Sequence, residues 1–350
     1  MEELNSEILL ELLDAREFKK LKEKLENMHP VDIVEVMEEV GERQRVLMFR
    51  LLAKEEAAEV FTDMNSDMRE DLINALTDSE LEEVMEEMYV DDTVDVVEEM
   101  PANVVDRLLK ATDEETRKKI NALLQYPEDS AGSIMNIEYI SLRKEMTVEE
   151  AILKIRQVGI NKETIYTCYV TEKKKLIGSV DVKDLLTVGE SRLIEEIMDE
   201  NVLCARTLDD QEKVAAMIEK YSLVAIPIID HENCLVGIVT VDDVMQILRD
   251  ETTEDIHRLG GVDEGEKVDG SLKDSVKSRL PWLIVNLVTA ILAAAVVGMF
   301  EGTIQAVVSL ATFMPIVTGM GGNAGTQTLT IIVRGLALGE LNFKNMKKVF

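Results

Sequence analysis

The sequence has 350 residues and a formal net charge of -31, and this length accommodates two or three domains. Four basic and two acidic residues follow position 280, so the first 280 residues carry a net charge of -33. Such an acidic surface repels nucleic acid and anionic lipid and attracts cations, which excludes DNA or RNA binding.

The three cysteines, Cys168, Cys204 and Cys234, lie far apart and have no CxxC or histidine-paired spacing. This usage is typical of buried residues in a reducing compartment. The start, MEELNSEILL, is acidic rather than basic, so we expect no cleaved secretory signal. The histidines lack ligand-like spacing, and no Ser/His/Asp set or zinc motif occurs, so we do not expect an enzyme.

Residues 1–128 have a helical pattern with a short internal repeat. Glu-Val pairs recur at 35/36, 59/60 and 83/84, which is a spacing of 24 residues. Helix pairs that stack into a superhelix produce repeats of this kind. The sequence therefore predicts an acidic, all-α superhelical domain over 1–128. The methionines expected to pack between its helices are Met64, Met85, Met88 and Met100.

Residues 129–190 and 191–250 form a second repeat, of mixed type. Ile134-Met135 and Ile197-Met198 open the two copies, and each copy continues with a helix, a β-branched strand, a polar turn and a strand that runs into a helix. The hydrophobic period changes between 2 and 3.6 in the same order twice, with glycine at 178 and 237 and aspartate at 184 and 243. This order resembles a tandem pair of CBS domains, α+β modules that often bind adenine nucleotides.

Residues 251–280 predict a polar connector followed by a short surface helix over 271–280, capped near Asp269 or Ser271. From Pro281 to Phe300 the chain carries no charge, which is long enough to cross roughly 30 Å of hydrocarbon. A second membrane segment is predicted over Thr303–Leu338. The basic residues that flank the two segments are Lys273, Lys277, Arg279, Lys344, Lys347 and Lys348. Because two crossings place both groups on one side, the positive-inside rule predicts a multi-pass inner-membrane protein with its N-terminal domains in the cytoplasm.

The second segment, MPIVTGMGGNAGTQTLTIIVRGLALG from residue 314, interrupts its apolar character with glycines and amides. Pro315 removes one helix hydrogen bond and the glycines permit other geometries, so we expect the chain to leave helical geometry there. Freed carbonyl and amide oxygens would suit the outer shell of a hydrated Mg²⁺. Tight helix packing through small residues is the alternative. The residues predicted to line an ion path are Gly321, Gly322, Asn323, Gly325, Thr326 and Gln327.

The same segment carries a resemblance to a known family. Met314-Pro315, the GMGGNAGTQ run from Gly319 and VRGLA from Val333 look like the second transmembrane segment of the MgtE family of magnesium channels and transporters. The domain order along the whole chain is also similar to that family. The resemblance implies a homodimer with five spans per chain, a plug helix before the first span, and a pore lined by the second and fifth spans. Residues 281–350 supply two of these spans, so we interpret the sequence as part of a longer protein.

The acidic domains are predicted to sense the ion. Single carboxylates usually form solvated surface, but a net charge of -33 opposes close packing unless cations lie between the domains. The resemblance implies a set of regulatory Mg²⁺ ligands, namely Glu59, Asp91, Asp95, the backbone of Gly132, Asp210, Glu212, Asp243, Glu251 and Glu254. Ser222 and Gln246 stand where the family has a metal-binding aspartate pair, so we expect that one site to be lost.

The resemblance also implies an ATP site near Tyr166, Lys183 and Asp184. Asp184 would equally well cap the following helix, and Asp181 stands where CBS modules often have Ser or Thr. The prediction for the whole chain is a Mg²⁺ channel or transporter that closes when intracellular Mg²⁺ binds between its acidic domains. The alternative is a non-transporting, membrane-anchored CBS-domain sensor of ion or adenine-nucleotide levels.

Overall fold

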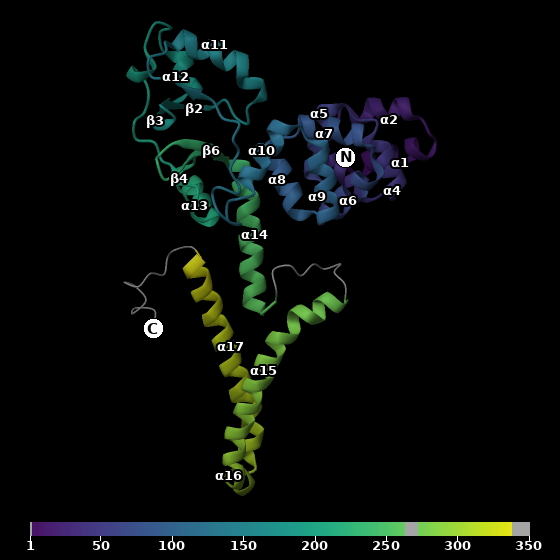
Figure 1. The fold of residues 1–350 in the computed structure, drawn as a ribbon. Coiled ribbons are helices and arrows are strands. Elements are labelled where there is room, and N and C mark those ends of the chain that lie inside the picture. The colour runs from purple at the N-terminus through teal and green to yellow at the C-terminus, as the bar shows by residue number, and fades with distance from the viewer. Residues whose placement is uncertain (1, 263–271, 338–350) are drawn as a thin grey trace. The chain divides into compact units, whose positions relative to one another are not determined.

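The computed structural model describes residues 2–262 and 272–337, and the chain divides into two compact units, Met1–Ile247 and Leu248–Phe350 (Figure 1). The first unit contains a helical domain and a pair of small α/β modules. The second contains long helices. The predicted cap at Asp269 or Ser271 and the basic residues Lys344, Lys347 and Lys348 lie outside the described residues.

The N-terminal domain is a stack of helix pairs, drawn in purple to blue in Figure 1. Its helices are α1 (Glu2–Asp14), α2 (Phe18–Leu25), α3 (Pro30–Glu38), α4 (Glu42–Phe49), α5 (Lys54–Asp63), α6 (Ser66–Ala75), α7 (Asp78–Glu87), α8 (Val90–Glu99), α9 (Ala102–Ala111) and α10 (Glu114–Leu123). From α3 onward, the first helix of each pair begins at 30, 54, 78 and 102, and the second at 42, 66, 90 and 114. Both series keep the 24-residue spacing, so the predicted helical repeat is confirmed.

Local capping and a shared core hold this stack together. Asn65 accepts a hydrogen bond from the Met68 N–H at 3.0 Å, and Thr77 and Glu80 form a reciprocal capping box at the start of α7. The first helices of successive pairs pack in the order α3, α5, α7 and α9. Their apolar faces form one core in which Phe61 contacts Phe49 edge-on, with 6.3 Å between ring centroids. The four methionines predicted to pack between helices, Met64, Met85, Met88 and Met100, are all buried there.

The two α/β modules each contain a three-stranded sheet. The first sheet has the order β1 (Ser141–Leu142), β2 (Thr167–Glu172), β3 (Lys175–Asp181), and the second has β4 (Ala205–Arg206), β5 (Ala225–Ile229), β6 (Leu235–Thr240). In each sheet the first pair is parallel and the second antiparallel. The accompanying helices are α11 (Val148–Val158), α12 (Val182–Thr187), α13 (Gln211–Tyr221) and α14 (Val241–Gly260). The predicted α+β pair is confirmed.

The opening segment of each module lies against the other module's sheet. The Asn136 N–H donates to the Ile238 carbonyl at 2.8 Å, and the Ser179 N–H donates to the Asp199 carbonyl at 3.0 Å. A Cβ added to Gly237 would lie 2.8 Å from the Met135 sulfur, and one added to Gly178 would lie 2.9 Å from the Met198 sulfur. The two glycines of the repeat therefore make room for the methionines that open it, and they do so across the pair.

All three cysteines are free thiols. Cys168 is buried in the first module, as predicted, whereas Cys204 and Cys234 are only half-buried. Burial raises the pKa of the Cys168 thiol to about 12, so it stays protonated at neutral pH.

The second unit differs from the prediction in its connections. The polar stretch from 251 is helical as far as Gly260, because α14 continues through it. The expected short helix over 271–280 is not separate either: α15 runs from Leu272 to Met299 with Pro281 inside it. A short helix, α16 (Glu301–Ala306), then leads into α17 (Ser309–Ala337). Prolines at membrane depth are tolerated because neighbouring groups re-satisfy the freed carbonyls.

The expected break in the glycine-rich segment is wrong for this structure. α17 is one continuous helix through Pro315 and all four glycines of the GMGGNAG run. Thr326, Thr328 and Thr330 each donate a hydroxyl hydrogen bond to the carbonyl four residues earlier, at 2.9 to 3.1 Å. Glycine lowers helix stability by only about 1 kcal/mol relative to alanine, so a long apolar helix absorbs several of them.

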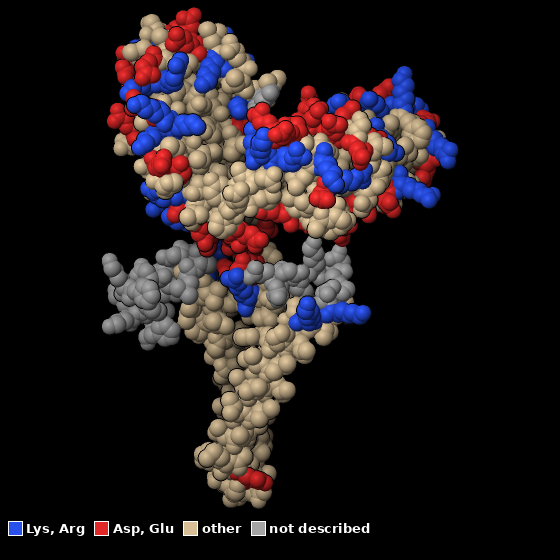
Figure 2. All heavy atoms as spheres, in the orientation of Figure 1, with Lys and Arg blue, Asp and Glu red and all other residues tan. Residues whose placement is uncertain are grey.

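Among the described residues, one helix is long and apolar enough to cross a membrane, Ser275–Met299. α17 is not such a helix, and its apolar sequence contains glycines, Asn323 and Gln327. On the face seen in Figure 2, the α15–α17 hairpin is almost free of charged side chains, in contrast to the mixed red and blue surface of the first unit. The described part of the second unit is thus an apolar hairpin with a polar stripe on α17, in which Gly322, Asn323, Thr326, Gln327 and Thr330 share one helix face at spacings of three and four residues.

Candidate metal and nucleotide sites

Carboxylates of three elements come together in the first unit. α8 begins with VDDTVD, which places Asp91 and Asp95 four residues apart on one helix face. Their charges interact with those at the start of α14 and with Glu163, which precedes β2. We call this group the acidic cluster; its members are Asp91, Asp92, Asp95, Glu163, Asp242 and Asp243.

Asp91 is the member with the least satisfied carboxylate. Its Oδ1 atom is buried and has no hydrogen-bond partner. Burial, and then the charges of Asp92, Asp243 and Glu163, raise the pKa of Asp91 well above its ordinary value. A buried acceptor without a donor costs free energy unless a proton or a cation occupies it.

The pKa values of the neighbouring carboxyls are raised as well. Desolvation and nearby carboxylates, led by Asp243, raise the pKa of Asp92 to about 6. Asp95 remains in contact with solvent. Partial desolvation, followed by the charges of Asp92 and Asp243, nevertheless raises its pKa to about 7. The pKa of Glu163 also rises to about 7, from desolvation followed by the charges of Asp242 and Asp243. In Asp243, desolvation raises the pKa even though Thr240 donates a hydroxyl hydrogen bond to it at 2.6 Å.

An arginine that recurs in other helix pairs of the stack is absent from α8. In three repeats an arginine of the second helix donates to a carbonyl near the end of the first: Arg45 to Met37 at 3.2 Å, Arg69 to Phe61 at 3.2 Å, and Arg117 to Leu109 at 3.4 Å. These arginines stand 24 or 48 residues apart, and the skipped position is Thr93. Thr93 is buried, and its hydroxyl donates a hydrogen bond to the Tyr89 carbonyl one helical turn earlier. The α7–α8 pair therefore lacks the cation that its neighbours have.

The other predicted metal ligands are distributed differently. Gly132 and Asp210 lie close together at the junction of the helical domain and the modules, where Ser130 and Asp210 form a β-bridge. Asp210 caps α13 by accepting from the Glu212 N–H at 2.9 Å. Glu59 is exposed on α5, and Glu251 and Glu254 belong to the second unit, where Glu254 pairs with Arg258. The structure therefore groups Asp91, Asp95 and Asp243, and it places Gly132 and Asp210 together at the junction.

In the part of the chain that the structure describes, no three histidine, cysteine, aspartate or glutamate side chains converge closely enough to hold a metal ion. The acidic cluster is a concentration of charge and not a preformed cage. Ser222, predicted to mark a lost site, ends α13 in a left-handed conformation with φ 53°, and Gln246 lies exposed on α14.

Sequence reasoning missed Asp92, Glu163 and Asp242. α8 and α14 both begin with the sequence Val-Asp-Asp. Asp92 is the direct neighbour of the predicted ligand Asp91, and Asp242 is the direct neighbour of Asp243, so both could have been predicted from their positions in the sequence. Glu163 had no such signal, because its approach to Asp242 depends on how β2 and α14 pack. The arginines that recur at multiples of 24 residues, with Thr93 at the position where one is missing, were also visible in the sequence and distinguish α8 from the other second helices.

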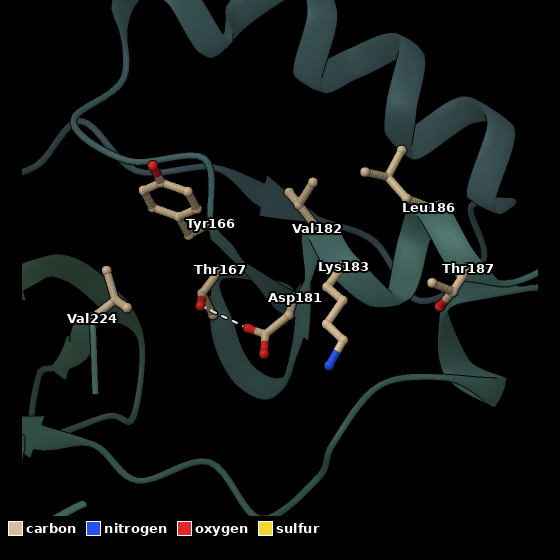
Figure 3. A pocket seen from close by; sticks show the side chains of 8 residues that line it. All are labelled: Tyr166, Thr167, Asp181, Val182, Lys183, Leu186, Thr187 and Val224. Carbon is tan, nitrogen blue, oxygen red and sulfur yellow. Dashed lines mark hydrogen bonds between the residues drawn. The ribbon is translucent and has the colours of Figure 1, made fainter. Parts of the chain in front are cut away.

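A second candidate site is a cavity of about 540 Å³, shown in Figure 3, which is lined by the first module and by Val224 of the second. The residues that line it are Tyr166, Thr167, Asp181, Val182, Lys183, Leu186, Thr187 and Val224. Two predicted nucleotide residues, Tyr166 and Lys183, are among them. The third, Asp184, is on the first turn of α12 and does not line the cavity. The volume lies in the range of small-molecule sites.

The predicted ion-path residues all lie on α17. Gly321, Gly322 and Gly325 have open space where a Cβ would be, and no atom of this chain lies within 4 Å of that position. Small-residue packing against another helix of the described chain therefore does not explain them. Asn323, Thr326 and Gln327 are exposed on the same helix.

A charged helical domain, a CBS pair and a helix able to cross a bilayer together define a membrane protein with a large acidic portion. Family comparisons agree with each part. Residues 28–129 match the MgtE intracellular N domain, residues 131–191 and 194–250 match the CBS domain, and residues 314–350 match a family described as a divalent cation transporter.

Whole-chain relatives agree as well. The chain is 36% identical over its full length to the magnesium transporter MgtE of Thermus thermophilus, covering 79% of that protein, and 30% identical to that of Bacillus subtilis, covering 77%. A crystal structure of the cytosolic domain of the Mg²⁺ channel MgtE in complex with ATP matches 69% of this chain and 99% of its own, with 35% identity and a TM-score of 0.66. The chain belongs to the MgtE family.

Proposed function

We propose that this chain carries Mg²⁺ across the cell membrane and that its acidic cluster senses intracellular Mg²⁺. The whole-chain relatives in Thermus thermophilus and Bacillus subtilis are named as magnesium transporters, not as enzymes. The observation that carries the sensing proposal is the buried, unpartnered Oδ1 of Asp91 among carboxyls of raised pKa. Such a group favours a cation, and Mg²⁺ prefers carboxylate oxygens.

The sensor works through the charge balance of the first unit. With Mg²⁺ bound near Asp91, Asp95 and Asp243, repulsion between the helical domain and the second module is relieved and the closed arrangement is stabilised by mass action. Because Mg²⁺ keeps several of its waters, it bridges carboxylates without a tight cage. When intracellular Mg²⁺ falls, the ion leaves, the carboxylates repel one another and the arrangement opens. Glu59, Gly132, Asp210, Glu212, Glu251 and Glu254 are proposed as further Mg²⁺ ligands.

The ion path follows the polar stripe of α17. Gly321, Gly322 and Gly325 leave the helix surface open, and Asn323, Thr326 and Gln327 add neutral oxygens. Such oxygens contact the hydration shell of Mg²⁺ without stripping it. A second copy of the chain would cover the glycine face, which supports a homodimer with the pore between the protomers. In this arrangement the protein is a multi-pass protein of the inner membrane and the acidic unit is cytoplasmic.

The cavity of the first module is proposed to bind ATP. The similar cytosolic domain was crystallised with ATP, and Tyr166 offers a ring for stacking while Lys183 offers a positive charge for phosphate. Asp184, on the first turn of α12, is proposed as a further residue of this nucleotide site.

Growth of a magnesium-auxotrophic strain tests the transport proposal. The gene should restore growth at low Mg²⁺, and Gly322→Val should abolish the rescue because a branched side chain then fills the polar stripe. Gly302→Val is the matched control, since Gly302 on α16 is equally open and lies off that stripe. Absence of rescue by the wild-type gene, with membrane expression verified, would reject transport and favour a membrane-anchored sensor.

A further inference from the structure

Asp181 occupies a helix-capping position but does not cap the helix. It is the N-cap residue of α12 with extended backbone, and its side chain accepts no hydrogen bond from the first turn. An aspartate at this position normally accepts from the N–H two or three residues later. Here its Oδ1 accepts a hydrogen bond from the Thr167 hydroxyl at 2.7 Å, and both side chains line the cavity (Figure 3).

The sheet register fixes this pair. Thr167 begins β2 and Asp181 ends β3, and the two residues are directly opposite each other in the antiparallel ladder. The carboxylate is therefore held by the strand edge and not by a mobile loop. Because Thr167 occupies Oδ1, the second oxygen remains for a ligand.

The cavity contains one acidic and one basic side chain. Lys183 follows Asp181 by two residues, and no ion pair joins their side chains in the described part of the chain. A fully ionised polyphosphate would bring several negative charges beside the Asp181 carboxylate with only Lys183 to offset them. Like charges at close range repel one another, and the repulsion increases as the distance between them decreases.

We infer that Asp181 selects the charge state of the ligand and makes the cavity a site for the Mg²⁺ complex of ATP, not for the free nucleotide. This inference rests on the nucleotide binding proposed above. Mg²⁺ on the phosphates reduces their charge, and the free carboxylate oxygen of Asp181 then faces a cation or one of its waters. The nucleotide site would thereby depend on Mg²⁺ independently of the acidic cluster.

Titration calorimetry on the whole chain in detergent tests the inference with ATP and adenosine as probes, each in EDTA and in Mg²⁺. In the wild type, Mg²⁺ should tighten ATP binding about tenfold, the effect of removing one unfavourable charge contact, and leave adenosine binding unchanged. The adenosine arm separates this effect from any change that Mg²⁺ causes at the acidic cluster. Asp181→Asn keeps the acceptor for Thr167 but loses the charge, and Asp181→Ser loses both.

Both variants should bind Mg²⁺-free ATP about tenfold more tightly than the wild type and lose most of the Mg²⁺ dependence. Glu195→Ser removes one exposed negative charge from the same module outside the cavity, and it should behave as the wild type. Unchanged Mg²⁺ dependence in Asp181→Asn, with ATP still bound, would overturn the role of Asp181 and leave nucleotide binding intact. No binding of either probe by the wild type would overturn both.

Discussion

Gly132 occupies a position where only a hydrogen atom fits. A Cβ added there would lie 2.6 Å from two ring carbons of Tyr126 and 3.0 Å from the Thr207 carbonyl oxygen, to which the Gly132 N–H donates at 2.9 Å. The residue therefore has a packing role at the junction of the helical domain and the modules, whether or not its backbone also contacts an ion.

We expect Gly132→Ala to lower the free energy of unfolding by about 1–3 kcal/mol, because overpacking forces the Tyr126 ring to move. Gly189→Ala is the matched control, since nothing lies within 4 Å of its Cβ position, and its effect should stay within about 0.5 kcal/mol. Thermal unfolding in EDTA measures both. If Gly132→Ala unfolds like the wild type in EDTA, the packing role is refuted.

The carboxyls of the acidic cluster also predict a pH dependence. The pKa values of Asp95 and Glu163 are raised to about 7 in the first unit, which the proposed function takes as the closed arrangement, so the neutral forms are favoured there. Ionising these two carboxyls costs more free energy in the closed arrangement than in the unfolded chain. This cost is absent below the ordinary pKa near 4, and the closed arrangement loses stability progressively as the pH rises from about 4 to 7. Without Mg²⁺, acidification from pH 7.5 to 5.5 should stabilise it.

Melting temperatures in EDTA at these two pH values measure this effect. A rise of a few degrees is expected on acidification, since about 1 kcal/mol shifts the melting temperature of a domain of this size by roughly 2–4 °C. The double variant Asp95→Asn/Glu163→Gln should lose most of the rise. A pH response that is identical in the wild type and the double variant would show that other groups control it.

At the scale of elements, the arginine series connects the helical repeat to the proposed ion site. Arg45, Arg69 and Arg117 each bring a positive charge to the end of the preceding helix, whereas the α7–α8 pair has Thr93. Arg69 also pairs with Glu99 at 2.8 Å, which shows that the series neutralises acidic residues of the next repeat. A divalent ion at α8 would supply the charge that this repeat lacks.

Thr93→Arg should therefore make the closed first unit less dependent on Mg²⁺. The new guanidinium would reach the Met85 carbonyl by analogy with its neighbours and offset the charges of Asp91 and Asp92. Limited proteolysis in EDTA should show more protection than in the wild type, and Thr93→Val, which only removes the hydroxyl, should show none. Equal cleavage of Thr93→Arg and wild type in EDTA, with both melting alike, would contradict this explanation.

Regular elements were predictable from the sequence, and their junctions were not. The Glu-Val spacing predicted the helix pairs, and the change of period predicted the two modules, because both patterns follow from which face each element buries. The break expected at Pro315 and Gly319–Gly325 did not occur, because local preferences of about 1–3 kcal/mol are outweighed within a long apolar helix.

The candidate sites were predictable to a similar extent. Asp91 and Asp95 share a helix face by spacing alone, but their meeting with Asp243 followed only from the family resemblance. Glu163 could not be found because its position depends on tertiary packing. In the cavity, Tyr166 and Lys183 were predicted and Thr167 was not, since its contact with Asp181 depends on strand register.

At the scale of the whole molecule, charge and apolar surface are separated along the chain. The first 280 residues carry a net charge of -33, while the α15–α17 hairpin is almost uncharged on the face in Figure 2. Repulsion among carboxylates of the first unit can influence the apolar hairpin only if the arrangement of the first unit changes. In the proposed function, preferential binding of Mg²⁺ to the closed arrangement would supply the differential affinity that such a change requires.

Limited proteolysis of the whole chain in detergent across a Mg²⁺ titration tests this central claim most directly. Protection of the first unit should rise at millimolar-scale Mg²⁺, on the order of physiological levels, because the ion binds the closed arrangement preferentially. The triple variant Asp91→Asn/Asp95→Asn/Asp243→Asn should lose that response. Cleavage of the wild type that is the same in EDTA and at the highest Mg²⁺ concentration would contradict the account.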